Sequence, residues 1–166
     1  MLRLYACLTE DHDLRLVVVA VVVCVFACFW GFGLLGRVRH AATHRGRLGW
    51  LLAAAAVTGG GVWATHLVAM LAYRPGVPVG YEGGATALSI AIAIAVMLAG
   101  FAVGLLSEAW APAGGALVGG GIGAMHFTGM AALNLPATLL WDDRFVVAAL
   151  VVGVGGGALA VWIGAQ

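Results

Sequence analysis

Five stretches of this chain are each about as long as a lipid bilayer is thick, and they contain almost no charge. A helix needs ~20 apolar residues to cross a hydrocarbon core of ~30 Å. Since 63% of the 166 residues are hydrophobic and only 9% are charged, the sequence predicts an all-α, polytopic transmembrane helical bundle. A β-barrel would need short segments that alternate in polarity, and these runs do not alternate. The five predicted spans cover residues 14–35, 48–72, 85–106, 113–135 and 145–164.

Two of these spans contain copies of one motif. Residues 58–70 and 118–130 align at a constant offset, and each copy has three consecutive glycines followed by a histidine. The histidines are His66 and His126, and both lie inside otherwise apolar helices. One such histidine would most often be a packing residue. Because a polar ring is costly to place in hydrocarbon, its recurrence with the glycines favours a functional site.

An acidic turn with an aromatic neighbour precedes the first, third and fifth predicted helices. We interpret the repeat unit as this turn, a descending helix, a cytoplasmic loop and an ascending helix with a histidine near its outer end. Two units are complete, and the third supplies only its first helix before Gln166. We therefore expect one domain over residues 1–166 with a truncated third repeat, either as a piece of a longer protein or as a shortened form whose fifth helix a partner covers. The turns are His12-Asp13, Tyr81-Glu82 and Trp141-Asp142-Asp143.

Charges near the helix ends predict how the bundle lies in the membrane. Cytoplasmic loops are rich in Lys and Arg, so the basic loop between the first and second spans is expected inside the cell. The N-terminus and the loops at 73–84 and 134–143 are then outside, and the C-terminus is cytoplasmic. The leader before the first span is acidic through Glu10 and Asp11, which argues against a cleaved signal peptide. The basic loop carries Arg37, Arg39, Arg45 and Arg47.

The two histidines are expected at a similar depth, about five residues or ~8 Å below the outer helix ends. A methionine follows each histidine by four residues and so shares its helix face. If the second and fourth helices are neighbours, two imidazoles and two or three thioethers converge. Such soft ligands suit Cu(I) and tolerate Cu(II), and they lack the thiolates usual in structural zinc sites. The predicted metal ligands are His66, Met70, Met125, His126 and Met130.

Two other interpretations of the histidines stay open. Haem b could be held by His66 and His126 as opposed axial ligands. Alternatively, the two side chains could form a metal-free hydrogen bond between helices. The cysteines offer little: Cys24 and Cys28 are interpreted as small hydrophobic residues within the first helix, and Cys7 has no evident disulfide partner.

The chain contains no recognisable catalytic pattern. It has no nucleophile–base pair, no phosphate-binding loop followed by lysine and no nucleotide fingerprint, and the glycine run at 153–157 lies inside a span. We therefore expect no enzymatic activity in this chain and no nucleic-acid partner. A transport or purely structural subunit remains an alternative, although no acidic residue within the second or fourth helix marks a polar path.

The second motif copy, Met125-His-Phe-Thr-Gly-Met130, resembles the signature of the bacterial MHYT family of integral membrane sensor domains. The first copy, Thr65-His-Leu-Val-Ala-Met70, is a degraded version that keeps the histidine and the final methionine. Thr65 stands where the family has methionine, and Phe127 stands where it usually has tyrosine, so a thioether and a hydroxyl are missing. The third motif helix is also absent.

The resemblance covers essentially the whole chain and implies a function. Such domains are proposed to bind copper near the outer face, to sense a diatomic gas such as oxygen, carbon monoxide or nitric oxide, and to be fused to cytoplasmic output modules. We therefore expect a sensor module of a bacterial signalling protein in the cytoplasmic membrane. Its expected partners are the lipid bilayer, a gas ligand and an output domain such as a cyclic-di-GMP enzyme, kinase or regulator. The alternatives are a bis-His haem electron carrier and a metal-free structural or transport subunit.

Overall fold

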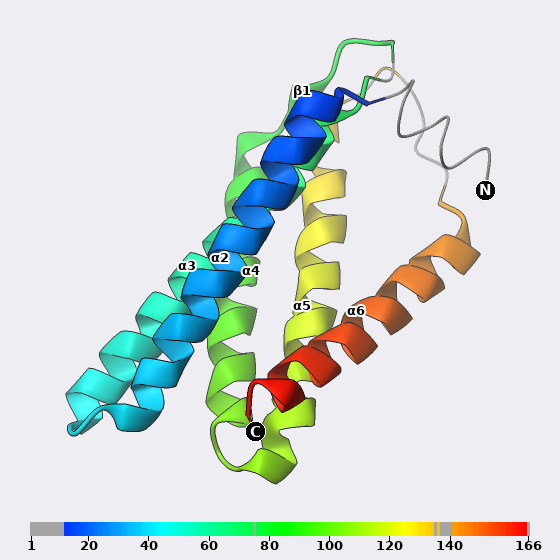
Figure 1. Ribbon diagram of the computed structural model, residues 1–166. Coiled ribbons are helices and arrows are strands. Elements are labelled where there is room, and N and C mark those ends of the chain that lie inside the picture. The colour runs from blue at the N-terminus through cyan, green and yellow to red at the C-terminus, as the bar shows by residue number, and fades with distance from the viewer. Residues whose placement is uncertain (1–11, 75, 135, 137–140, 166) are drawn as a thin grey trace.

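The computed structural model describes residues 12–74, 76–134, 136 and 141–165, and this part of the chain forms a bundle of five long helices (Figure 1). The predicted all-α class is confirmed. Cys7, Glu10, Asp11 and Leu135, on which some expectations rest, lie outside the described residues. The helices are α2 (Leu14–His40), α3 (His44–Ala72), α4 (Gly83–Gly104), α5 (Ala111–Ala131) and α6 (Asp143–Ile163), with a 3-10 turn η1 (Glu108–Trp110) and two short strands, β1 (Gly80–Tyr81) and β2 (Leu133–Asn134).

Four of these helices, α2, α3, α4 and α6, are long and apolar enough to cross a membrane. The five predicted spans are thus supported for four helices. Helix α5 has comparable length, at 21 residues, and contains many glycines and the histidine His126. It packs against α4 on one side and α6 on the other, so much of its surface faces protein instead of lipid.

The predicted basic loop between the first two spans is wrong in its bounds. Helix α2 continues to His40, and α3 begins at His44, so only residues 41–43 connect them. Basic side chains in the last turn of α2 complement the negative end of its helix dipole. Thr43 then caps α3, because its hydroxyl accepts a hydrogen bond from the backbone nitrogen of Gly46 at 3.1 Å. The arginines therefore lie within α2 and α3, and both helices are longer at this end than predicted.

The bundle has two distinct ends, which we name by their residues. The histidine end contains His66 and His126 and the last turns of α3 and α5. The arginine end contains the connection at 41–43 with the arginines on either side of it. At the arginine end Arg39 Nη1 donates a hydrogen bond to the carbonyl oxygen of Ala165 at 3.3 Å. The end of α6 therefore contacts the end of α2.

Contacts between helix backbones hold the bundle together. A Cβ atom added to Gly119 of α5 would lie 2.0 Å from the carbonyl oxygen of Gly153 in α6, and one on Gly59 of α3 would lie 2.8 Å from Ile94 Cα in α4. Lipid tails are as apolar as leucine, so membrane helices associate largely through such close packing. A buried cluster of Ala54, Ala55, Met97, Phe101 and Val118 then joins α3, α4 and α5.

Main-chain hydrogen bonds tie the helices together at the histidine end. The backbone nitrogen of Asp13 donates to the carbonyl oxygen of Ala72, and that of Glu82 donates to the carbonyl oxygen of Ala132, both at 2.8 Å. These two bonds are equivalent in the repeat, since each joins the turn before a descending helix to the end of a histidine helix. Strands β1 and β2 pair antiparallel beside the second bond.

The contact between α5 and α6 gives a test of this packing. Gly119→Ala places a methyl group against the backbone of α6, and overpacking of this kind costs about 1–3 kcal/mol. We expect the variant to unfold at correspondingly lower denaturant concentration in detergent. Gly155→Ala is the matched control, because Gly155 lies on the same helix pair with nothing within 4 Å of its added Cβ. Equal stability of the two variants would contradict the packing.

Candidate functional site

The two motif histidines meet across the bundle. His66 projects from α3 and His126 from α5, and their Nδ1 atoms lie 3.2 Å apart. The ring centroids are 4.8 Å apart with an interplanar angle of 73°. In a direct hydrogen bond one ring donates its Nδ1 hydrogen and the other accepts, so the two rings hold complementary tautomers. The structure therefore brings together the pair of imidazoles that the repeat singled out.

A cavity of about 340 Å³ opens beside the histidine pair. Both methionines that follow the histidines, Met70 and Met130, line it together with His66 and His126. Met125 does not line this cavity. Its side chain is 1% exposed within the bundle, because a residue one position before His126 is rotated by about 100° around the helix. Four of the five predicted ligand residues thus share one cavity.

Three further residues that the motif did not predict also line this cavity. His12, Tyr73 and Tyr81 line it near the ends of the helices. The His12 and Tyr73 rings stack with centroids 5.2 Å apart, and their backbones form an isolated β-bridge. A signal was present in the sequence, because His12 and Tyr81 are the aromatic neighbours of the acidic turns in the first and second repeats. Their side chains fold back over the site.

Gly129 makes room for the His66 ring. A Cβ atom on Gly129 would lie 2.6 Å from His66 Nε2 and 3.0 Å from His66 Cδ2. A side chain at this position would therefore displace the imidazole from its place beside His126. The glycine of the second motif copy is thus explained by the ring of the first copy.

An aromatic row extends from the histidine pair toward α6. Phe127 stands 5.2 Å from the His126 ring and 5.4 Å from the Trp141 ring, measured between centroids. The threonine at the first motif's methionine position plays a different part, because Thr65 Oγ1 donates to the carbonyl oxygen of Gly61 at 2.8 Å. That hydroxyl is satisfied within its own helix.

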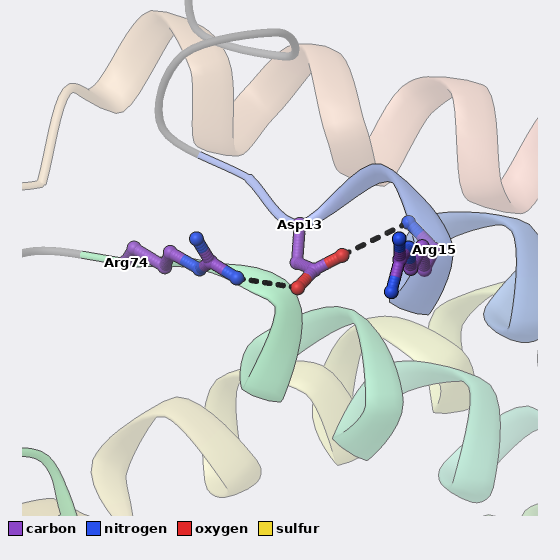
Figure 2. Close-up of polar contacts among 3 residues, drawn as sticks. All are labelled: Asp13, Arg15 and Arg74. Atoms are coloured by element: carbon purple, nitrogen blue, oxygen red, sulfur yellow. Dashed lines mark hydrogen bonds and ion pairs between the residues drawn. The ribbon is translucent and has the colours of Figure 1, made fainter.

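The acidic residues of the turns cap the descending helices. Asp13 accepts a hydrogen bond from the Arg15 backbone nitrogen at 3.0 Å and forms an ion pair with Arg74, as Figure 2 shows. The backbone hydrogen bond first, and then the Arg74 charge, lower the pKa of Asp13. Backbone hydrogen bonds from Ala85 and Gly84 likewise lower the pKa of Glu82. These carboxylates stay ionised at neutral pH and fix the rim of the cavity.

The side chains that meet here define the chemistry available to the site. In the described part of the chain, no group of three or more His, Cys, Asp and Glu side chains comes together. The donors closest to each other are therefore the two imidazoles, and the cavity beside them is also lined by the thioethers of Met70 and Met130 and by the His12 ring. Metal–imidazole bonds of about 2.0–2.1 Å separate two nitrogens of a near-tetrahedral site by about 3.3 Å. The observed 3.2 Å between the Nδ1 atoms fits one shared ion.

A bundle of apolar helices around a paired, half-buried histidine site defines an integral membrane module. The family model of the MHYT "bacterial signalling protein N terminal repeat" matches this chain twice, over residues 59–114 and 119–166. The chain belongs to the MHYT family of bacterial signalling proteins. The two matches begin at Gly59 and Gly119, the first glycines of the two triplets, so they follow the same repeat offset as the histidines.

Relatives with curated descriptions are bacterial signalling proteins. The chain is 44% identical over 163 residues to an uncharacterized signaling protein of Caulobacter vibrioides, covering 96% of this chain and 20% of the relative. It is 34% identical to the bifunctional diguanylate cyclase/cyclic di-GMP phosphodiesterase MucR of Pseudomonas aeruginosa, covering 94% and 23%. It is 33% identical to the cyclic di-GMP phosphodiesterase NbdA of the same species, covering 84% and 18%.

This chain thus spans about a fifth of the length of these relatives. The part of the relatives that it matches carries the MHYT-type N-terminal repeat of bacterial signalling proteins. No solved structure matches the chain.

Gly129 provides a test of the histidine geometry. In Gly129→Ala the added methyl group pushes the His66 ring away from His126, so the hydrogen bond between the Nδ1 atoms is lost or lengthened. We expect the ¹⁵N signals of the two rings to move in NMR spectra of histidine-labelled protein in detergent. Gly60→Ala is the control, since no atom lies within 4 Å of its added Cβ. Unchanged ring signals in Gly129→Ala would contradict the arrangement.

Glu82 gives a test by pH. Because its folded-state pKa is lowered, the ionised carboxylate stabilises the folded state above its usual pKa of 4.5, and this contribution is lost as the pH falls through the folded pKa. We expect Glu82→Gln to melt a few degrees below the unsubstituted protein at pH 7. The difference should shrink as the pH falls below about 4.5, as followed by circular dichroism. A difference that is independent of pH would exclude this role for the charge.

Proposed function

We propose that this chain is a copper-binding sensory module that responds to a diatomic gas or to a redox change at the outer face of the bacterial cytoplasmic membrane. The observation that carries the proposal is the 3.2 Å contact between His66 Nδ1 and His126 Nδ1, on a cavity that Met70 and Met130 also line. The N-terminus would lie outside and the C-terminus in the cytoplasm, as the arginines predict.

Copper is favoured by the chemistry of the donors. Imidazole and thioether ligands select copper over hard cations such as magnesium and calcium. Bound copper would supply a redox-active centre that can also take a small ligand. His66 and His126 would hold it, Met70 and Met130 would add thioether ligands, and Met125 would support the helix from within the core.

The same contact makes the haem alternative less favourable. Axial histidines of a haem stand on opposite faces of a flat macrocycle. Two rings within hydrogen-bond distance leave no space for a macrocycle between them. A metal-free structural pair is the stronger competitor, since one hydrogen bond satisfies one polar atom of each ring.

The response would pass through helices α3 and α5. These two helices have few contacts with each other, because α4 packs against both of them. The histidine pair is therefore one of the few direct links between them. A change in what His66 and His126 hold would shift one helix against the other and bias any output module that follows α6. Because the relatives named above are cyclic-di-GMP enzymes, we propose that the output is cyclic-di-GMP synthesis or hydrolysis.

Copper content tests the proposal directly. We expect the protein purified in detergent and loaded with Cu(I) to retain about one copper per chain. The double variant His66→Ala/His126→Ala should retain at least tenfold less, since it removes the two imidazoles that approach each other within 3.2 Å. His40→Ala is the control for a histidine outside the cavity, and it should retain copper fully. Equal copper in all three proteins would overturn the metal site.

Optical absorption and electron paramagnetic resonance spectra of the same samples separate the remaining alternatives. A Soret band in protein expressed with sufficient haem supply would favour the electron carrier. A change in the electron paramagnetic resonance of the Cu(II) form on exposure to nitric oxide would support gas sensing. Copper that is retained but insensitive to oxygen, carbon monoxide and nitric oxide would restrict the function to redox sensing.

A further inference from the structure

One of the cavities at the arginine end of the bundle lies between helices, far from the histidines. It has a volume of about 230 Å³, and Val38 of α2, the first turns of α3 and the end of α4 line it. Its walls are apolar and include Leu48, Leu51, Ala102 and Leu105. The helices cross closely at Gly59 and Ile94 and leave this groove nearer to the arginine end, where Figure 1 shows the ends of α3 and α4 apart.

Two basic side chains stand at the groove. His44 and Arg47 line it together with the apolar residues, and both are exposed. Among the described residues, the ion pair that the structure shows joins Arg74 to Asp13 at the opposite end of the bundle. Within this part of the chain, neither His44 nor Arg47 forms an ion pair with an acidic side chain. Their side-chain donors are therefore available to a ligand.

Other arginines at this end are engaged or lie elsewhere. Arg37 stacks on the Trp50 ring, with its guanidinium carbon 4.9 Å from the ring centroid, and Arg39 binds the Ala165 carbonyl oxygen. Arg45 is exposed, but it does not line the groove. A ligand that binds in the groove would contact Arg47 and not Arg45, whereas a ligand attracted to the basic surface in general would depend on both residues.

We propose that this groove binds one anionic glycerophospholipid. The phosphate group would contact His44 and Arg47, and an acyl chain would lie along Leu48, Leu51 and Ala102. The charge of the headgroup complements the Arg47 guanidinium, and the His44 ring can donate a hydrogen bond to a phosphate oxygen. Basic pockets between membrane helices are known to hold acidic lipid headgroups. A free phosphate would contact the basic residues but not the apolar walls. Because the groove has both, we infer that its ligand is a lipid. The bound lipid would fix the angle between α3 and α4, independently of any metal at the histidine end.

Native mass spectrometry of the full chain in detergent tests the lipid site. The probes are dioleoyl-phosphatidylglycerol and dioleoyl-phosphatidylcholine, which have the same acyl chains and differ in headgroup charge. We expect the protein to retain phosphatidylglycerol preferentially. Loss of one basic contact weakens such binding about fivefold, so Arg47→Gln should remove most of that preference.

Arg45→Gln is the matched control, because it removes the same charge from the same helix turn outside the groove. It should leave the preference within twofold of the unsubstituted protein. Ala102→Phe fills the apolar part of the groove while keeping every charge, and it should lower retention of both lipids. Equal effects of Arg45→Gln and Arg47→Gln would overturn the site, as would equal retention of the two lipids by the unsubstituted protein. Circular dichroism would verify that each variant keeps its helical content.

Discussion

Close contact between helix backbones sets the geometry of this molecule. In hydrocarbon the helices gain little by burying apolar side chains against each other, so association depends on dispersion contacts that small residues permit. Gly59 lets α3 touch α4, and Gly119 lets α5 touch α6. Helix α4 then stands between the two histidine helices, and His66 reaches His126 where α3 and α5 come together. The site is a consequence of where glycine permits the helices to cross.

Much of the fold could be predicted from the sequence, because apolar length and a repeated motif are local properties. The offset between His66 and His126 was enough to expect that the two rings lie at one depth. The ends of α2 and α3 could not be placed by hydropathy. Arg37 and Arg39 are polar, yet they continue α2 because the negative end of its dipole favours them there, and the Thr43 cap lets α3 begin soon after.

The surroundings of the histidines were harder to predict. His12 and Tyr73 belong to different turns, and the β-bridge between them, with the neighbouring bond from Asp13 to Ala72, brings them to the cavity. The role of Gly129 depends on the ring of His66, which belongs to the other motif copy and faces it across the bundle. Met125 was expected beside the histidines from its place in the motif, but the rotation of the helix directs it into the core. Such features depend on tertiary contacts that a single helix pattern does not contain.

The hydrogen bond from Arg39 to the Ala165 carbonyl oxygen closes the bundle into a ring at the arginine end. Phe32 of α2 also lies beside Gly164 at the end of α6. A tilt of α2 therefore reaches the end of α6 by a direct route, without passing through the three helices between them.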